Sequence, residues 1–192
     1  MTYQSIWYYT KLPESMVNIL CEDLQYGDML LQEATVGNRN DPGVLDAKKR
    51  KSKVTWTPKN YWIHGFCYHY IMEANLSNFN YDIYGFQHQE MQYTVYNEGE
   101  YYGWHFDDEI TVDMDDHIGM KRKLSFSLQL TDPSEYEGGV MQIRSFEDTL
   151  YEVPKEKGVI VIFDSRARHR VTKVKSGCRK SLVGWVGGPK WK

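Results

Sequence analysis

Three side chains, those of His105, Asp107 and His169, have the types and the spacing to bind one metal ion. His105 and Asp107 are two residues apart in the segment at 101–109, and residues two apart on a strand present their side chains to the same face. His169 follows the apolar run at 158–163, and the end of a buried strand could return it to the first pair. Two imidazoles and one carboxylate on one face of the ion form the donor set of a non-haem Fe(II) centre with positions open for substrates.

Neighbouring acids and the other histidines are weaker candidates for this role. The alternation that aligns Asp107 with His105 turns Asp108 away, and Glu109 lies one step further along, where solvation is expected. The remaining histidines have no comparable partners in the sequence and are expected to be structural: His64, His69, His88 and His117.

Arg179 is a candidate anchor for a carboxylate. It follows His169 by ten positions, and Ser181 falls on the same strand face. The planar guanidinium matches a carboxylate with paired hydrogen bonds, and a neighbouring hydroxyl can add another. A fixed carboxylate anchor near the metal is what a keto-acid cosubstrate requires.

These residues lie in three spaced motifs that resemble the Fe(II)- and 2-oxoglutarate-dependent dioxygenases, in particular the branch of prolyl 4-hydroxylases and PKHD-type hydroxylases. The motifs are Q-Y-x-x-Y-x-x-G-x-x-Y-x-x-H-x-D from Gln92 to Asp107, S-x-Q-L-x-D-P-x-x-Y-x-G-G from Ser127 to Gly139, and H-R-V-T-x-V-x-x-G-x-R-x-S from His169 to Ser181. The resemblance extends from about residue 75 to residue 185, and several motifs in the right order are more specific than any one of them.

The resemblance implies roles for individual residues. His105, Asp107 and His169 would bind Fe(II), and Arg179 would pair with the distal carboxylate of 2-oxoglutarate. Three further residues would contact the cosubstrate: Tyr96, Ser181 and Gln129. Three aromatic residues would line the substrate pocket: Tyr102, Trp104 and Trp185. Animal oxygen-sensing prolyl hydroxylases have a tyrosine where this chain has Gln129.

The resemblance also implies an activity. The enzyme would use O2 and 2-oxoglutarate to hydroxylate a C–H bond, with release of succinate and CO2, and ascorbate could serve as reductant. A prolyl or other peptidyl residue in a peptide or protein is the favoured substrate, and a small molecule is the other option. We expect the protein to be a monomer or a homodimer.

Two alternative functions stay open. An AlkB-like oxidative demethylase of nucleic acid would share this chemistry, but those proteins carry a second arginine six positions after the anchor, where this chain has Trp185. A non-enzymatic, cupin-like metal-binding barrel is suggested by the spacing between Gly99 and His105, but cupins continue with H-x-H where this chain has H-x-D.

The elements that position these residues can be placed from the sequence pattern. Apolar residues at helical spacing predict a short helix after Pro13, and Thr57-Pro58 predicts the N-cap and first position of a second helix. The apolar stripe of the second helix comprises Ile63, Phe66, Cys67, Tyr70, Ile71 and Ala74. The segment at 36–53 has turn chemistry and predicts a long loop.

From residue 79 onwards the period is 2, which predicts short strands. Leu124, Phe126, Leu128 and Leu130 share one face of a strand, and Ser125, Ser127 and Gln129 share the other. In the last strand one face carries Arg179, Ser181, Val183 and Trp185. The run at 158–163 suits a strand buried on both faces.

Helices followed by many short strands predict a mostly β fold with flanking helices (α+β). We expect a double-stranded β-helix, or jelly roll, with the N-terminal helices packed on one sheet. One domain would span 1–192, with a helical face at about 12–78 and a jelly-roll core at about 79–188.

Composition excludes several other classes. The chain has 192 residues, a formal net charge of -3 and 15% aromatic residues, which is unlike a disordered segment. No apolar run is long enough for a membrane span, so no membrane association and a cytoplasmic location are expected. Three widely spaced cysteines predict free thiols.

Two charged segments are candidates for other ligands. The basic cluster at 48–53 could contact nucleic acid, but a charge run in a loop is usually solvated and the chain is slightly acidic, so a nucleic-acid partner is not favoured. The acidic segment at 107–117 partly imitates a calcium loop, but Leu124 stands where the final glutamate should be. We expect a solvated loop at 108–121 beside the metal site, with a role as a substrate lid.

Overall fold

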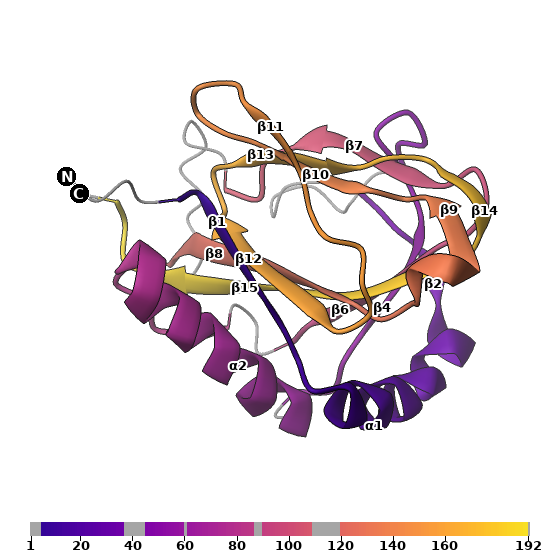
Figure 1. The fold of residues 1–192 in the computed structure, drawn as a ribbon, viewed down its shortest axis with the longest axis horizontal. Helices are drawn as coiled ribbons and strands as arrows, with labels where there is room; N and C mark the ends of the chain where they lie inside the picture. Colours follow the sequence, from indigo (N-terminus) through magenta and orange to yellow (C-terminus); the bar gives the residue numbers. More distant parts are fainter. Residues whose placement is uncertain (1–4, 37–44, 60, 87–89, 109–119, 192) are drawn as a thin grey trace.

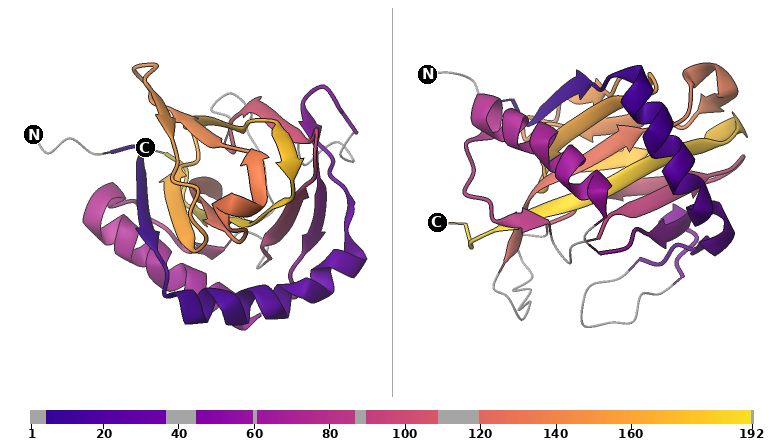
Figure 2. Two further views of the ribbon diagram at one scale, coloured as in Figure 1. Left: turned by 45° about the vertical axis from the view of Figure 1, so that its right-hand side comes forward. Right: turned by 90° about the horizontal axis from the view of Figure 1, so that it is seen from below.

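Two antiparallel β-sheets face each other, and two helices cover the outer face of the larger sheet (Figure 1). The computed structural model describes residues 5–36, 45–59, 61–86, 90–108 and 120–191. The view from below in Figure 2 shows both helices lying across the strands of the larger sheet. This architecture is the predicted jelly roll with a helical face.

The larger sheet has the strand order β1-β12-β8-β15-β6-β4-β2, and β5 pairs with β15. Its strands are β1 (Trp7–Lys11), β12 (Val159–Asp164), β8 (Lys121–Gln129), β15 (Arg179–Gly188), β6 (Gln92–Tyr96), β4 (Lys53–Trp56), β2 (Gln32–Glu33) and β5 (Gly85–Phe86). Every residue of β12 is buried, because the helices lie over one face of this sheet and the smaller sheet over the other. The prediction of a strand buried on both faces is confirmed.

The smaller sheet has the order β11-β10-β13-β7-β3. Its strands are β11 (Leu150–Glu152), β10 (Met141–Arg144), β13 (Arg168–Val171), β7 (Tyr101–His105) and β3 (Arg50–Lys51). A separate pair joins β9 (Tyr136–Gly138), which follows the 3-10 turn η4 (Pro133–Glu135), to β14 (Val174–Gly177). Strands β13 and β7 pair so that His169 lies opposite His105.

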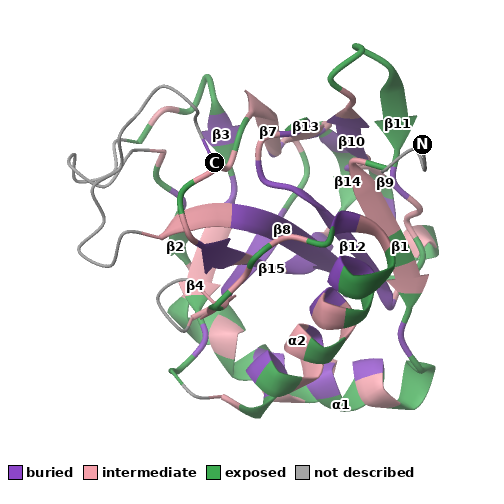
Figure 3. Cartoon of the chain, turned by 90° about the vertical axis from the view of Figure 1, so that its left-hand side faces the viewer, coloured by how far each residue is buried: buried purple, intermediate pink, exposed green. Residues whose placement is uncertain are grey.

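Helices α1 (Glu14–Leu24) and α2 (Trp62–Ala74) are amphipathic and turn their apolar sides to the larger sheet. The 3-10 turn η1 (Gln25–Leu30) continues α1, and the π-helical turn η2 (Asn75–Phe79) continues α2. The main core is made by helix and strand residues that include Leu20, Ile63, Cys67, Ile71, Phe126, Leu128, Ile160, Ile162 and Leu182. In Figure 3 the sheet-facing turns of α2 and the central strands are coloured as buried. Each large apolar side chain buried in this layer contributes roughly 1.5–3 kcal/mol.

Alternation along β8 and β15 separates this core from the space between the sheets. Leu128 lies opposite Leu182 on the helix side, whereas Gln129 lies opposite Ser181 and Ser125 lies opposite Trp185 on the inner side. The polar faces predicted for the two strands therefore meet between the sheets. They bring hydrogen-bonding side chains to the interior while the helices remain packed on leucines.

Two local predictions are wrong. The segment at 36–53 is not a continuous loop, because β3 and the first residue of β4 lie in its described part and pair with β7 and β6. Thr57 does not cap α2: the N-cap is Tyr61, and the Thr57 hydroxyl instead accepts a hydrogen bond of 2.9 Å from the amide of Met91. In both places long-range strand pairing overrides a local turn or capping signal.

The three cysteines are free thiols, as predicted, with Cys67 buried and the other two half-buried. Neither helix in the described part of the chain has the length and apolar character that crossing a bilayer requires. The acidic segment at 107–117 and the predicted lid at 108–121 lie mostly outside the described residues, as do Glu109, His88 and His117.

Candidate active site

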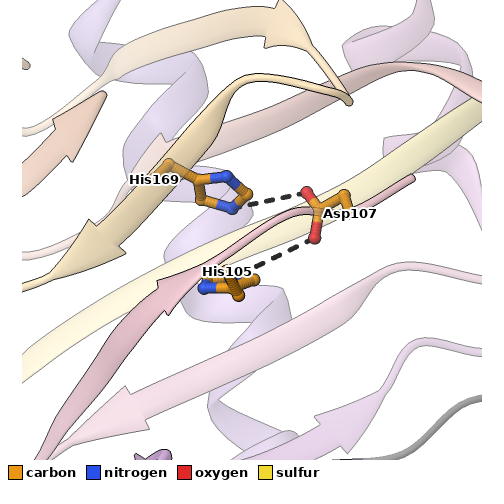
Figure 4. Close-up of side chains that lie close together, drawn as sticks. All are labelled: His105, Asp107 and His169. Atoms are coloured by element: carbon orange, nitrogen blue, oxygen red, sulfur yellow. Dashed lines mark ion pairs between the residues drawn. The ribbon is translucent and has the colours of Figure 1, made fainter. Parts of the chain in front are cut away.

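The side chains of His105, Asp107 and His169 converge between the sheets. Nε2 of His105 lies 3.8 Å from Oδ1 of Asp107, and Nε2 of His169 lies 3.5 Å from Oδ2 of the same carboxylate (Figure 4). One donor atom from each of the three residues falls within 4.8 Å of the others. These separations exceed hydrogen-bond length and leave room for a shared cation. The predicted group of three is therefore brought together.

Both imidazoles are held in the tautomer that binds a metal through Nε2. Nδ1 of His105 lies 2.8 Å from the carbonyl oxygen of Gly103, and Nδ1 of His169 lies 3.0 Å from that of Ala167. A ring nitrogen facing a carbonyl must carry the proton, so the lone pair is on Nε2, which faces Asp107. Such outer hydrogen bonds orient the histidine ligands of metal sites.

The protonation states also suit a divalent cation. Burial, reinforced by the neighbouring His169, lowers the pKa of His105 to about 3, so its imidazole is neutral at physiological pH. Burial alone would raise the pKa of Asp107, but the two imidazoles and the nearby Arg122 outweigh it and hold the pKa below its ordinary value. The group thus offers the neutral imidazole of His105 and an anionic carboxylate oxygen, and Nε2 of His169 faces the same carboxylate.

Asp107 lies two residues beyond the end of β7 and is fixed by its surroundings. Its amide donates to the carbonyl oxygen of Ser165 at 3.0 Å, its carbonyl oxygen accepts from Arg122 at 3.2 Å, and its carboxylate is hydrogen-bonded by Ser125. Asp108 points elsewhere, because its carboxylate accepts from the indole of Trp191 at 3.4 Å. The choice of Asp107 over Asp108 agrees with this geometry.

A β-bulge in β7 decides which aromatic side chains reach the site. His105 pairs with His169 but Tyr102, not Gly103, pairs with Val171, so the register shifts within β7. Tyr102 consequently faces inward, and its ring stacks on that of His105 with centroids 3.6 Å apart.

Trp104 is turned to the opposite face and does not join the pocket. Its ring lies under the guanidinium groups of Arg144, Arg168 and Arg170, with Arg170 closest at 4.6 Å from the centroid. The two β13 arginines flank His169 and point away from it, so Trp104 lies on the outer face of the smaller sheet. The role that the resemblance implied for Trp104 is corrected, because neighbouring residues of a strand point to opposite faces and Trp104 directly precedes the inward-facing His105.

Arg179 lies at the first position of β15 and is only 1% exposed. Nη2 donates to Oε1 of Gln129 at 2.8 Å, and Nη1 donates to Oγ of Ser181 at 3.2 Å. The guanidinium carbon lies 5.4 Å from the centre of the Tyr96 ring. The residues predicted to surround a carboxylate anchor are thus all in contact with it.

The Nε atom of Arg179 is buried and has no hydrogen-bond partner among the described residues. Leaving a charged buried donor unsatisfied is costly, and a bound carboxylate would satisfy it. Gly139 makes room for this side chain, because it has φ +56° and a Cβ there would lie 3.1 Å from Cδ of Arg179. Tyr96 packs with Val171, Val174 and Tyr102, which links the arginine to the imidazole of His105 through two rings.

Trp185 reaches the same interior from the other end of β15. Its ring lies 4.3 Å from the guanidinium carbon of Arg122 and 6.2 Å from the ring of Trp56, and its Nε1 is a buried donor without a partner among the described residues. The sequence pattern does not identify Arg122 as a site residue. Its inward position follows a register shift in β8, where Leu124 lies opposite Val186 but Arg122 lies opposite Gly187, which simple alternation cannot foresee.

The space between the sheets thus has a group of metal-binding side chains at one side and a buried arginine, a candidate carboxylate anchor, at the other. Residues 91–187, about half of the chain, match the family described as the 2OG-Fe(II) oxygenase superfamily. A PKHD-type hydroxylase from Aliarcobacter butzleri is 38% identical over 96 residues, which are 49% of this chain and 41% of that protein. The chain spans about two fifths of the length of the curated relatives that it matches.

Solved structures share the fold at low sequence identity. A prolyl-4-hydroxylase from Pseudomonas putida superposes with a TM-score of 0.71 at 19% identity, covering 97% of this chain and 94% of that one. A prolyl hydroxylase from Trichoplax adhaerens, in complex with a peptide fragment of the hypoxia inducible factor oxygen degradation domain, gives 0.72 at 16% identity, covering 94% and 83%.

Proposed function

Because the chain belongs to the 2OG-Fe(II) oxygenase superfamily, we propose that it is an Fe(II)- and 2-oxoglutarate-dependent dioxygenase that hydroxylates a C–H bond of a prolyl or other peptidyl residue. Fe(II) together with 2-oxoglutarate and O2 would supply the oxidising chemistry and yield succinate and CO2. The protein's own contribution is to bind, to orient and to exclude water.

The metal would be held by Nε2 of His105 and His169 and by the carboxylate of Asp107. The carbonyl groups of Gly103 and Ala167 fix the ring orientations by accepting from Nδ1. Stacking of Tyr102 on His105 restricts that ring further. The three donor atoms lie within 4.8 Å of one another, so only small rotations of these side chains would bring them to one cation.

The observation that carries the proposal is the buried Nε of Arg179 without a partner among the described residues. An arginine this deep in the interior would be expected to have a carboxylate partner, but the described side chains that hydrogen-bond to it are neutral: Gln129, Ser181 and Tyr136. The distal carboxylate of 2-oxoglutarate supplies the missing charge. The four residues proposed for the cosubstrate, Arg179, Tyr96, Ser181 and Gln129, are those that meet around the guanidinium.

The substrate would approach beside Trp185 and Arg122. The indole N–H of Trp185, which has no partner among the described residues, can donate to a peptide carbonyl, and Trp56, which is 47% exposed, extends the aromatic wall outward. The prolyl hydroxylase from Trichoplax adhaerens is in complex with a peptide fragment, which supports a peptide substrate here. Tyr102 and Trp185 remain our candidates for the pocket, and Trp104 does not.

The other functions considered gain no support. The relative from Aliarcobacter butzleri is a PKHD-type hydroxylase. Position 185 of this chain holds a tryptophan packed against Arg122, in place of the second arginine that an AlkB-like demethylase would use. The H-x-D pair with a buried arginine anchor also speaks against a cupin-like barrel. Use of ascorbate, a monomeric or dimeric state, a cytoplasmic location and the single-domain organisation stay predictions.

The test is a screen for succinate release with Fe(II), 2-oxoglutarate and ascorbate present or omitted. Proline-containing peptides, free amino acids and oligonucleotides would be tested in parallel as substrates. The mass of each would be measured by mass spectrometry before and after the reaction. We expect a gain of one oxygen on a peptide, coupled one to one to succinate. Succinate release coupled to loss of a methyl group from an oligonucleotide would contradict the proposal.

A further inference from the structure

A second arginine, Arg50, is buried beside the site. It lies on β3, opposite Tyr102 of β7, and is 8% exposed. Its Nη2 donates to Oε1 of Gln92 on β6 at 2.8 Å, and its Nε donates to Oγ of Ser52 at 2.8 Å. Gln92 lies opposite Val183, on the inner face of the larger sheet. The guanidinium therefore bridges the two sheets from the inside.

Arg50 contacts Tyr102, the aromatic residue that packs against the proposed metal ligand His105. Its guanidinium carbon lies 4.6 Å from the centre of the Tyr102 ring, and the same ring stacks on His105. Its positive charge contributes to the lowered pKa of His105. One phenol ring thus separates a buried cation from a proposed iron ligand.

No carboxylate pairs with Arg50 among the described residues. Its two side-chain hydrogen bonds go to a neutral amide and a neutral hydroxyl, and its Nη1 has no hydrogen bond within the described part of the chain. A buried guanidinium without an anion carries a desolvation cost of several kcal/mol. Such a cost is offset when a ligand brings the opposite charge into the site.

Resting on the proposed function, we propose that Arg50 binds a carboxylate of the substrate and so selects acidic substrates. The two carboxylates of 2-oxoglutarate already have places, one at Arg179 and one at the metal. Arg50 is therefore available to a third carboxylate. The paired N–H donors of its guanidinium match the two oxygens of such a group. The carboxylate can come from an acidic side chain next to the hydroxylated residue or from a free α-carboxylate.

The test compares matched probes on the full chain, with Zn(II) in place of Fe(II) so that no turnover occurs and with saturating 2-oxoglutarate. One pair is N-acetyl-L-proline and its amide, and the other is acetyl-Pro-Glu-amide and acetyl-Pro-Gln-amide. Dissociation constants would be measured by ligand-observed NMR. We expect the carboxylate member of one pair to bind about tenfold more tightly or better, and the pair that discriminates identifies the source of the carboxylate.

Variants assign the preference to Arg50. Arg50→Gln should abolish it, and Arg50→Lys, which keeps the charge but loses the fork, should retain part of it. Gln92→Glu keeps Arg50 but sets a carboxylate against it, and should abolish the preference without removing the buried cation. Arg168→Gln, on the outer face over Trp104, is the control and should leave the preference unchanged.

Equal binding within both pairs in the wild type, or an unchanged preference in Arg50→Gln and Gln92→Glu, would overturn the inference. A loss of 2-oxoglutarate affinity in Arg50→Gln would also overturn it, by assigning Arg50 to the cosubstrate. Absence of metal-dependent 2-oxoglutarate binding in the wild type would count against the proposed function as well. Failure of the probe comparison with normal cosubstrate binding counts against Arg50 alone.

Discussion

The ring of Tyr102 stacks on the imidazole of His105 with centroids 3.6 Å apart and planes inclined by 12°, although the residues are three apart on one strand. Regular alternation would place them on opposite faces of the sheet. The bulge at this point of β7 turns both inward, and the phenol ring becomes part of the support of a proposed iron ligand.

Removing this ring should weaken metal binding. Tyr102→Ala leaves His105 free to rotate, and we expect Zn(II) affinity to fall about tenfold or more, as for other residues that orient metal ligands. Tyr102→Phe keeps the ring and should bind Zn(II) like the wild type. Competition with a chromogenic chelator measures both. Equal affinity in Tyr102→Ala would show that the stack does not orient the ligand.

Substitutions of the adjacent Asp107 and Asp108 should have different effects on metal binding. Asp107→Asn replaces the anionic donor and should abolish stable Fe(II) or Zn(II) binding, because two neutral imidazoles alone hold a divalent ion weakly. Asp108→Asn is the matched control, since that carboxylate faces Trp191, and it should bind metal normally. Calorimetric titration with Zn(II) separates the variants, and the reverse order of effects would reassign the ligand.

Alanine substitution of two glycines should change the free energy of unfolding in opposite directions. Gly139→Ala puts a Cβ at φ +56° and within 3.1 Å of Arg179, Tyr136 and Val174, so we expect about 1–2 kcal/mol less free energy of unfolding and weaker 2-oxoglutarate binding. Gly65 is an exposed position in α2 where a Cβ meets nothing within 4 Å. Gly65→Ala should stabilise by about 1 kcal/mol. Urea denaturation measures the free energy of unfolding of both variants. Stabilisation by Gly139→Ala would refute the close packing around Arg179.

The three thiols should differ in reactivity. Burial raises the pKa of Cys67 to about 12, so almost no reactive thiolate forms at pH 8 and solvent has no access. Cys21 and Cys178 also have pKa values raised by burial, but both are half-buried. Iodoacetamide followed by peptide mass spectrometry should label these two first and Cys67 only in urea. Early labelling of Cys67 would mean that α2 does not stay packed on the sheet.

The parts of this structure that the sequence predicts are those governed by a regular period. Alternation places Ser125 and Gln129 on one face of β8 and Arg179 and Ser181 on one face of β15, and both faces line the interior. The apolar run before His169 forms a strand buried on both sides. Period and burial are sufficient here because one face of each strand packs on the helices.

The residues that the sequence does not place depend on broken register or on distant contacts. Alternation omits Tyr102 and Arg122 from the interior, because each lies beside a bulge that reverses its expected face. The resemblance assigns Trp104 to the pocket, but as the neighbour of the inward-facing His105 it points to the outer face. Arg50 resembles one member of a solvated basic run, yet its partner Gln92 lies 42 residues away. Neither effect leaves a local signal in the sequence.

We propose that one interior site binds a metal through His105, Asp107 and His169 and a dicarboxylate through Arg179. Anaerobic calorimetric titration of 2-oxoglutarate, with and without Fe(II), tests it most directly. We predict binding that requires Fe(II) and weakens by about 1.5–3 kcal/mol for each charge-assisted hydrogen bond lost in Arg179→Gln, with no change in Arg170→Gln on the outer face. Equal 2-oxoglutarate affinity with and without Fe(II), or equal affinity in the wild type and Arg179→Gln, would contradict this proposal.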